Sequence, residues 1–386
     1  MSNSNEKSMN NLTAGWYNTI VTALGLDDSS FQLIQGSLPL GDTSVPLFQM
    51  SDSVPPQSVT TYFSTSEWNR FSSDYKELLF AMSPGDSAND LKKVLGDTYA
   101  VWVSYRTSFY DKNPDSTKSQ EDLFKIFANQ HLDPGPAQQA ILAFQKSEIS
   151  PVNDAITAFL DQSNYLQGEP IYNQTIEQIK TAILSGQSAP IAYDSKTADS
   201  DVTNTWAEGA VGGLIEFFDF EAEAGGTYEA INTKASSSEV TISGTISKYV
   251  TVPIGPGKWF DSGVFNNAYK SKDNNYVWDV ASQTTWETCF GPSGMMPRVI
   301  TSLIIVDGID ITITSKASYS SEEYSKITQE SEGGFFPFFM AESESTHTSD
   351  VKHNADATIT VTHKSNIGNP QILGVNVKDV EDAFNN

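Results

Sequence analysis

The sequence predicts an α+β protein, with an N-terminal helical bundle followed by a C-terminal antiparallel β-sandwich. Apolar residues recur at helical spacing through the first half of the chain, and beyond residue 238 they alternate with Ser and Thr. A polar stretch at 193–205 separates the two patterns. We therefore expect a mainly helical domain at 1–192, a linker or transition segment at 193–238 and an antiparallel β domain at 239–386.

The first half of the chain carries signals for helix starts and ends. An apolar face at Trp16, Ile20 and Leu24 is followed by Gly25, which suits a helix C-terminus. Ser64 and Glu67 have the spacing of a capping box that opens a second helix. Four further features complete the predicted bundle: one helix through Leu91 to Tyr105, an N-cap at Ser119, first-turn prolines at Pro136 and Pro151, and a helix from Ile176 to Gly186.

The second half carries strand signals. Val240, Ile242 and Ile246 alternate with Ser and Thr, as expected for a strand with one solvent-exposed face. Asp307 and Gly308 separate two apolar runs, and because Asp-Gly tolerates the positive φ of a tight turn, this arrangement predicts a β-hairpin. Two more strands are predicted, at Ala357–Thr362 and Leu373–Val377. Two sheets packed face to face would bury these apolar rows.

The net charge of the chain limits the classes of partner that it can bind. The chain has 48 acidic and 23 basic residues and a net charge of −25, so it repels nucleic acid and anionic lipid headgroups. Only Arg70, Arg106 and Arg298 could supply a forked phosphate contact. No P-loop or G-x-G-x-x-G motif is present. We therefore expect no nucleic-acid partner and no cofactor.

The N-terminus and the cysteine content bear on localisation. The first residues are polar and lack the apolar core of a secretory signal, and the single Cys289 excludes an intrachain disulfide. No apolar stretch approaches the length of about 18–20 residues that spans a bilayer. We expect cytoplasmic synthesis without a signal peptide, and any export would use a route that needs none.

One group of residues is a weak metal-site candidate. His347, Asp350 and His353 lie close together in the sequence, with His363 a short distance beyond. They match neither a zinc-finger spacing nor H-E-x-x-H, and His363 is in phase with the apolar residues of its predicted strand. We favour histidines with ordinary surface or core-edge roles over a metal site.

A row of carboxylates is the best candidate for catalysis. Asp219, Glu221 and Glu223 alternate with Phe218 and Phe220, so an extended chain would place the acids on one side. Such a row could bind Ca²⁺ or supply the acid and base of glycoside hydrolysis. We favour the alternative, the charged face of an edge strand. No nucleophile motif is present, so the sequence favours a protein that is not an enzyme.

Two aromatic groups are candidates for binding or association. The first surrounds a proline and would either plug an open end of the sandwich or form an apolar loop that docks a partner or a lipid surface. It consists of Phe335, Phe336, Phe338 and Phe339. The second lies among Asn and Asp residues and would either stack on sugars or form a core under long loops. It consists of Trp259, Trp278 and Trp286.

Three function classes follow, in order of preference. The first is a non-enzymatic interaction or self-assembly protein whose β domain presents a surface to a protein partner, a glycan or another copy of itself. The second is a soluble pore-forming or membrane-attacking toxin, because Ser and Thr alternating with apolar residues suit hairpins that enter a membrane. The third is a motif-poor, carboxylate-dependent hydrolase that uses Asp219, Glu221 and Glu223.

Overall fold

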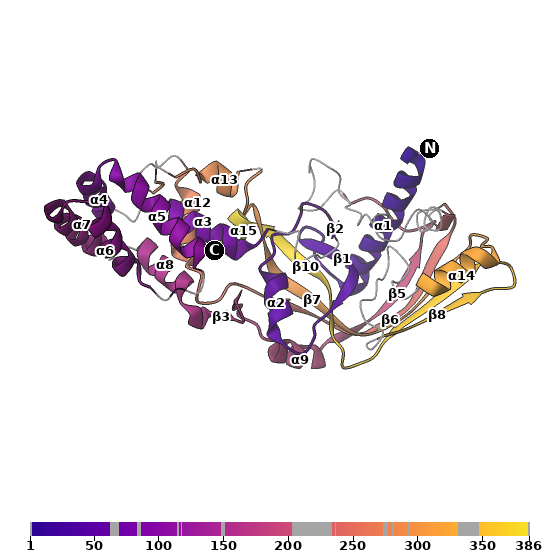
Figure 1. The fold of residues 1–386 in the computed structure, drawn as a ribbon. Coiled ribbons are helices and arrows are strands. Elements are labelled where there is room, and N and C mark those ends of the chain that lie inside the picture. Colours follow the sequence, from indigo (N-terminus) through magenta and orange to yellow (C-terminus); the bar gives the residue numbers. More distant parts are fainter. Residues whose placement is uncertain are drawn as a thin grey trace.

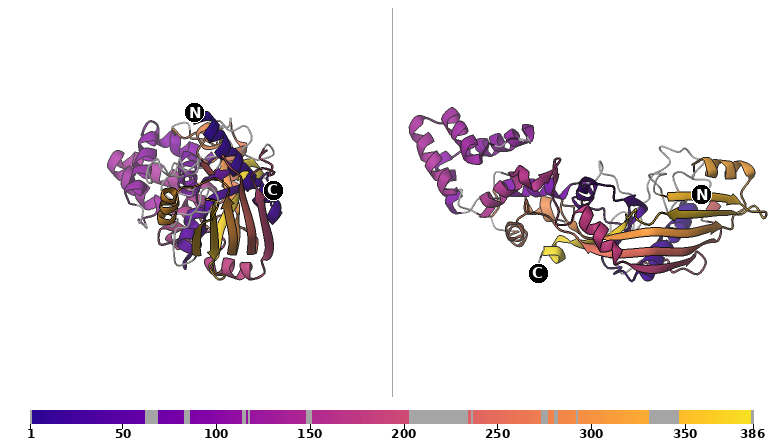
Figure 2. Two further views of the ribbon diagram at one scale, coloured as in Figure 1. Left: turned by 90° about the vertical axis from the view of Figure 1, so that its right-hand side faces the viewer. Right: turned by 90° about the horizontal axis from the view of Figure 1, so that it is seen from below.

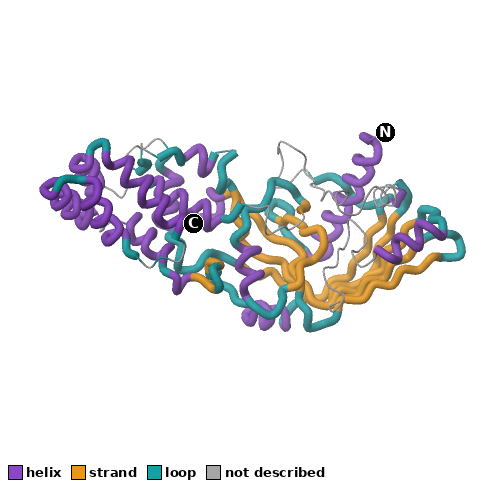
Figure 3. Tube along the Cα trace, in the orientation of Figure 1, coloured by secondary structure: helices purple, strands orange, loops and turns teal. Residues whose placement is uncertain are grey.

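Most helices gather at one end of an elongated molecule, and a large antiparallel sheet with several helices beside it forms the other end (Figure 1). The tube trace shows the same arrangement of helices and strands (Figure 3). This computed structural model describes residues 2–384 apart from 62–68, 83–85, 114–115, 117, 148–150, 203–233, 236, 273–276, 280–281, 292 and 331–346. The predicted α+β class is confirmed.

The elements have the following bounds. The helices are α1 (Ser2–Leu24), α2 (Ser44–Ser51), α3 (Phe71–Ala81), α4 (Asp86–Leu95), α5 (Thr98–Lys112), α6 (Gln120–His131), α7 (Pro134–Ser147), α8 (Pro151–Leu160), α9 (Ile176–Leu184), α12 (Ser262–Lys270), α13 (Trp286–Phe290), α14 (Ser321–Glu330) and α15 (Val380–Phe384). The strands are β1 (Phe31–Pro39), β2 (Thr60–Thr61), β3 (Tyr165–Leu166), β4 (Glu169–Pro170), β5 (Gln187–Asp194), β6 (Val240–Pro253), β7 (Arg298–Ser315), β8 (His347–His353), β9 (Ile359–Ser365) and β10 (Gln371–Asp379).

Most of the predicted helix ends are confirmed. Gly25 follows α1 with φ +60°, Pro151 opens α8, and the Ser119 hydroxyl accepts a hydrogen bond from the backbone of Asp122 at the start of α6. The single helix expected through Leu91 to Tyr105 is wrong. Gly96, with φ +52°, separates α4 from α5 there, since this backbone conformation ends a helix. The capping box predicted at 64–67 lies outside the described residues.

The sheet runs in the order β2-β1-β10-β7-β6-β5, and β9 and β8 extend it beside the second half of β7. The hairpin predicted at Asp307-Gly308 is wrong, because β7 continues through it as one strand of 18 residues. β6 pairs with β7 in one register, from Val240 opposite Ser315 to Pro253 opposite Ser302. This long ladder keeps the Asp-Gly pair within the strand. On the other side of β7 the neighbour changes there from β10 to β9.

The predicted sandwich is not confirmed. The described strands form one eight-stranded sheet and the separate β3–β4 pair, and the long helix α1 lies against β5 (Figure 2). β1 and β5 come from the N-terminal part of the chain but join the sheet, so helices and strands are interleaved in sequence. The division into 1–192, 193–238 and 239–386 stays a prediction.

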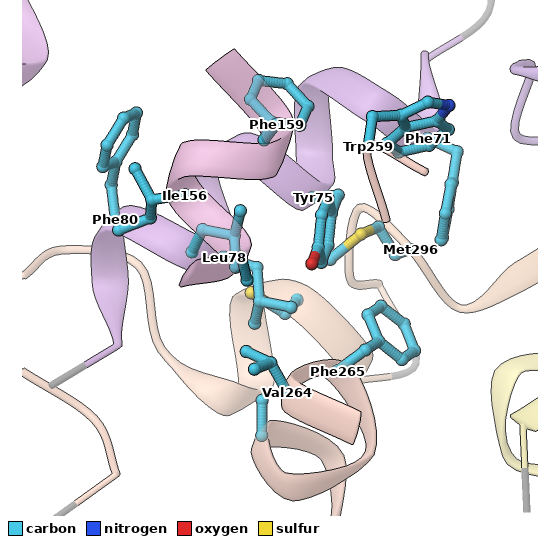
Figure 4. Close-up of a cluster of buried hydrophobic side chains, with 14 of the residues drawn as sticks. Phe71, Tyr75, Leu78, Phe80, Ile156, Phe159, Trp259, Val264, Phe265 and Met296 are labelled. Carbon is cyan, nitrogen blue, oxygen red and sulfur yellow. The ribbon is translucent and has the colours of Figure 1, made fainter. Parts of the chain in front are cut away.

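Two apolar cores hold the molecule together. Under α1, the side chains of Trp16, Tyr17 and Ile20 pack with Ile242 and Ile311 of the sheet. A second core joins the helices to the segment between β6 and β7, where aromatic rings meet at close range (Figure 4). In it the ring centroids of Tyr75 and Phe260 lie 4.8 Å apart, and Trp259 and Phe265 are fully buried. Burial of each such side chain contributes about 1.5–3 kcal/mol.

Candidate functional site

Four neighbouring strands have ends that are level with one another at the Ser315 end of β7, away from the helices α3 to α8. Asp194 at the end of β5 lies opposite Thr241 of β6, and Ser315 at the end of β7 lies opposite both Val240 and Ile359. The chain leaves this end twice, through residues 195–239 between β5 and β6 and through residues 316–358 between β7 and β9. Both long connections therefore leave from one end of a single antiparallel sheet.

The two connections contact each other through polar side chains. Lys196 and Lys316 both bind the carboxylate of Glu239, and Lys234 binds Glu323 of α14 at 2.8 Å. Hydrogen bonds from Lys196 and Lys316 lower the pKa of Glu239. These three ion pairs involve partly exposed side chains, and surface pairs of this kind stabilise a fold only slightly. The ion pairs described between the two connections are therefore weak ones.

The first residues of the second connection are also tied to the sheet. The hydroxyls of Ser315 and Tyr319 lie 2.8 Å apart, and the Tyr319 backbone N–H donates to the carbonyl of Ala357 at 2.8 Å. His353 contacts the Tyr319 carbonyl through Nε2 at 3.0 Å and stacks on Tyr324 with ring centroids 5.0 Å apart. These contacts fasten α14 and β8 beside β9.

This end of the sheet has one covered face and one wet face. Buried Ile242, Ile313 and Val361 point toward the core under α1, and the residues between them along each strand are Ser or Thr with partly or fully exposed side chains. The Thr314 and Thr360 hydroxyls of neighbouring strands lie 3.4 Å apart. The pattern of alternating polarity predicted for these strands is therefore present across the whole width of β6, β7 and β9.

The sheet also has two open edges in this region. Among the described residues β5 pairs only with β6, and β8 pairs only with β9. Backbone groups along an unpaired edge can accept a strand from another chain. Proline is tolerated in edge strands, and β5 contains Pro190.

The predicted tryptophan group is divided between core and surface. Trp259 and Trp278 are buried, and their indole N–H groups donate to the carbonyls of Ile171 and Ser271. Trp286 is only half-buried, although its N–H donates to the Tyr269 carbonyl at 2.6 Å. The structure therefore leaves one of the three tryptophans accessible to a ligand.

Other predicted residues fall in two groups. The phenylalanine group at 335–339 and the carboxylates at 219–223 lie outside the described residues. His347, Asp350 and His353 lie on β8, and His363 is buried on the neighbouring β9. Within the described part of the chain, no group of three His, Cys, Asp or Glu side chains is placed to hold a metal ion.

Asp74 is a buried carboxyl that sequence reasoning missed. It lies on α3 with 9% of its surface exposed, and its Oδ2 atom has no hydrogen-bond partner among the residues that the structure describes. Burial raises the pKa of Asp74 to about 7, and the charges of Glu77 and Asp52 add to the effect. Burial likewise raises the pKa of the Cys289 thiol to about 12, so this cysteine is not an activated nucleophile.

The raised pKa of Asp74 makes stability depend on pH. An aspartate has a pKa of about 3.9 in the unfolded chain, whereas the pKa of Asp74 in the folded protein is about 7. Between these two pH values the folded state keeps a proton that the unfolded state has lost, so stability falls as pH rises through this window. Asp74→Asn is therefore expected to raise the melting temperature by several degrees at about pH 8 and by little at about pH 4. Thermal unfolding followed by circular dichroism measures this. The exposed Asp154→Asn is the control, and equal gains at both pH values would contradict the prediction.

Comparison of the chain with protein-family models, curated proteins and solved structures finds no match. Among the described residues, no helix has the length and apolar character needed to cross a membrane.

Proposed function

We propose that this chain is a non-enzymatic, self-assembling protein that attacks membranes. The observation that carries the proposal is the end of the sheet where β5, β6, β7 and β9 finish level and both long connections depart. The helices at the other end of the molecule would support this sheet.

The sequences of the two connections favour a membrane target. The first contains the alternation of Phe218 and Phe220 with Asp219 and Glu221, and the second contains the phenylalanines around Pro337. Alternating apolar and polar residues suit a strand between lipid and water, and clustered aromatic residues suit the surface of a bilayer. These two features lie far apart in the sequence, yet both belong to connections that leave the same end of the sheet.

Weak contacts between the two connections support a change of conformation. Among the described residues, the ion pairs of Lys316 with Glu239 and of Lys234 with Glu323 and a backbone hydrogen bond from Lys316 to Glu239 join the two connections, while β8 of the second connection pairs with β9. Segments held by such contacts open at low cost in free energy. The strands they leave, by contrast, are paired along their whole length and would stay folded.

The edges of the sheet favour self-association. β5 lies on one side and β8 on the other, so a contact between the two edges joins different surfaces of two copies. Such a head-to-tail contact makes a ring when it closes and a filament when it does not. A net charge of −25 opposes anionic membranes, so zwitterionic surfaces or acidic pH suit the attack best.

A proline in β5 tests the edge contact. Edge strands tolerate a proline whose nitrogen faces away from the neighbouring strand, as that of Pro190 does. Residues two apart in a strand share an orientation, so the backbone nitrogen of Ala192 also faces away from β6. Ala192→Pro is therefore expected to leave the monomer folded. It should reduce assembly on vesicles and the accompanying dye release by about tenfold or more, because it removes an outward donor and adds a clash.

The experiment compares wild type, Ala192→Pro and the matched control Ala192→Ser on phosphatidylcholine vesicles, on vesicles of total cell lipid and on cells, at neutral and acidic pH. Light scattering reports mass, and dye efflux reports damage. A wild-type protein that stays monomeric and releases no dye under every condition would show that the proposal is wrong. Equal assembly of the proline and serine variants would exclude β5 as the contact.

A further inference from the structure

A cleft of about 710 Å³ opens where the helical end meets the sheet. Its walls come from α12, α13, α15 and the adjoining ends of β7 and β10, and Figure 1 shows these helices close to one another. Small-molecule sites in proteins have volumes of about 300–1,000 Å³. The cleft lies at the Arg298 end of β7, whereas the two long connections lie at the Ser315 end.

The aromatic wall of the cleft offers ring faces to a ligand. Trp286 lies beside Tyr269 and Phe290, with ring centroids 5.8 Å from each. The indole N–H of Trp286 donates to the Tyr269 carbonyl, and the Tyr269 hydroxyl donates to Oε2 of Glu381 at 3.2 Å. What remains for a ligand on this wall is apolar ring surface.

The rest of the lining carries both signs of charge. Lys272 and Arg298 are the cations, and Glu287, Asp379 and Glu381 are the carboxylates. A free anion or a free cation would meet like charges here as well as opposite ones. A neutral hydroxyl both donates and accepts hydrogen bonds, so a ligand rich in hydroxyls can pair with the charged groups of either sign.

We propose that this cleft binds a neutral glycan, with one sugar stacked on Trp286 and its hydroxyls bonded to the surrounding carboxylates and to Arg298. The excess of carboxylates in the lining disfavours sialylated or sulfated sugars. Binding here does not depend on assembly or on a membrane. The proposal therefore goes beyond the proposed function, and it would identify what the molecule recognises at the end of the sheet away from the connections.

The side chain of Lys272 covers the ring of Trp286. Its ammonium group lies 4.3 Å from the centre of the Trp286 ring and 2.6 Å from Oε1 of Glu287. Half or more of each of the Lys272 and Glu287 side chains is exposed, and contacts between such exposed groups are weak. A sugar would displace the lysine at low cost, so removal of the lysine side chain is expected to help stacking.

The test uses the full-length protein without lipid. A labelled sample is applied to an array of neutral, sialylated and sulfated oligosaccharides, and the strongest neutral oligosaccharide is then titrated by calorimetry. We expect binding of neutral glycans, a loss of about tenfold or more in affinity for Trp286→Ala, near-wild-type affinity for Trp286→Phe, and a gain of about twofold for Lys272→Ala.

Two controls keep the result interpretable. Tyr249→Ala removes another half-buried aromatic ring, on β6 and outside the cleft, and should not change affinity. Lys272→Ala changes a half-exposed side chain, so it reports on the cleft even if Trp286→Ala fails to fold. The proposal is overturned if no neutral glycan binds at millimolar concentration, if only acidic glycans bind, or if Lys272→Ala and folded Trp286→Ala both bind as wild type does.

Discussion

Replacing Asp52 by alanine is expected to lower the free energy of unfolding by about 3–5 kcal/mol. The Asp52 side chain is fully buried at the end of α2, and four donors point at it. Oδ1 accepts from the Ser72 backbone at 2.8 Å and the Tyr172 hydroxyl at 3.0 Å, and Oδ2 accepts from the Ser72 hydroxyl at 2.7 Å and Nε of Arg70 at 2.8 Å. All four contacts suit an ionised carboxylate, and its loss would leave the buried donors of Ser72 and Tyr172 without this acceptor.

The Asp52 network extends beyond its own helix. Arg70 also binds Glu169 of β4, and Glu169 accepts from Gln49 at 3.0 Å, so one carboxylate joins α2, α3 and the β3–β4 hairpin. The free energy of unfolding of an ordinary protein is about 5–15 kcal/mol, so loss of the Asp52 contacts would remove a large share of it.

Urea unfolding of Asp52→Ala and Asp52→Asn measures the effect of the Asp52 network. Asparagine should destabilise nearly as much as alanine, because its amide hydrogens would face the existing donors. Ser72→Ala, which removes one hydroxyl from the same site, should cost only about 1 kcal/mol. Coincident unfolding midpoints for wild type and Asp52→Ala would contradict the structure at this point.

Local signals in the sequence predicted the helix boundaries well, and long-range pairing was harder to foresee. Ser119 and Gly25 act within one turn of their own helices, so the sequence is enough to locate them. Asp307-Gly308 is a hairpin signal by itself, but β6 pairs with both sides of it and keeps the chain extended. Only a partner strand from elsewhere in the chain decides between these outcomes.

The strands β1 and β5 were not predicted, for a related reason. β5 does alternate, with buried Ala189, Ile191 and Tyr193 between exposed neighbours, and this period of two was the available signal. This short strand ends at the start of the polar stretch at 193–205 and follows directly after a helical pattern. Its alternation was therefore too short to distinguish it from its surroundings. β1 lies in a region rich in Pro, Gly and Ser, where single-sequence patterns favour loops.

The candidate sites also depend on contacts between distant parts of the chain, which the sequence alone does not reveal. The sequence indicates Trp286 as a binding residue, but of the charged residues in its cleft only Glu287 belongs to the same helix, and the others come from distant parts of the chain. Asp379 lies opposite Arg298 only because β10 pairs with β7 in a particular register. The level ends of β5, β6, β7 and β9 are likewise a property of register, which alternation of residue types cannot specify.

Gly244→Ala is expected to destabilise the sheet by about 3 kcal/mol, because β6 and β7 approach too closely there for a methyl group. A Cβ atom at this position would lie 2.1 Å from the carbonyl oxygen of Asp310 and 2.6 Å from Cα of Ile311, and both are backbone atoms that cannot rotate away. The strands would have to separate or twist near the middle of the long β6–β7 ladder.

Urea unfolding together with hydrogen exchange of the β6 and β7 amides would measure the Gly244→Ala effect, with lost protection expected on both strands. Gly135→Ala is the matched control, since no atom lies within 4 Å of its Cβ position in α7, and it should leave stability unchanged or slightly raised. Wild-type stability of Gly244→Ala would contradict the close approach. Because β6 and β7 carry the ends of both connections, a folded but loosened Gly244→Ala protein should also assemble less well on vesicles, which would link the stiffness of this ladder to the proposed function.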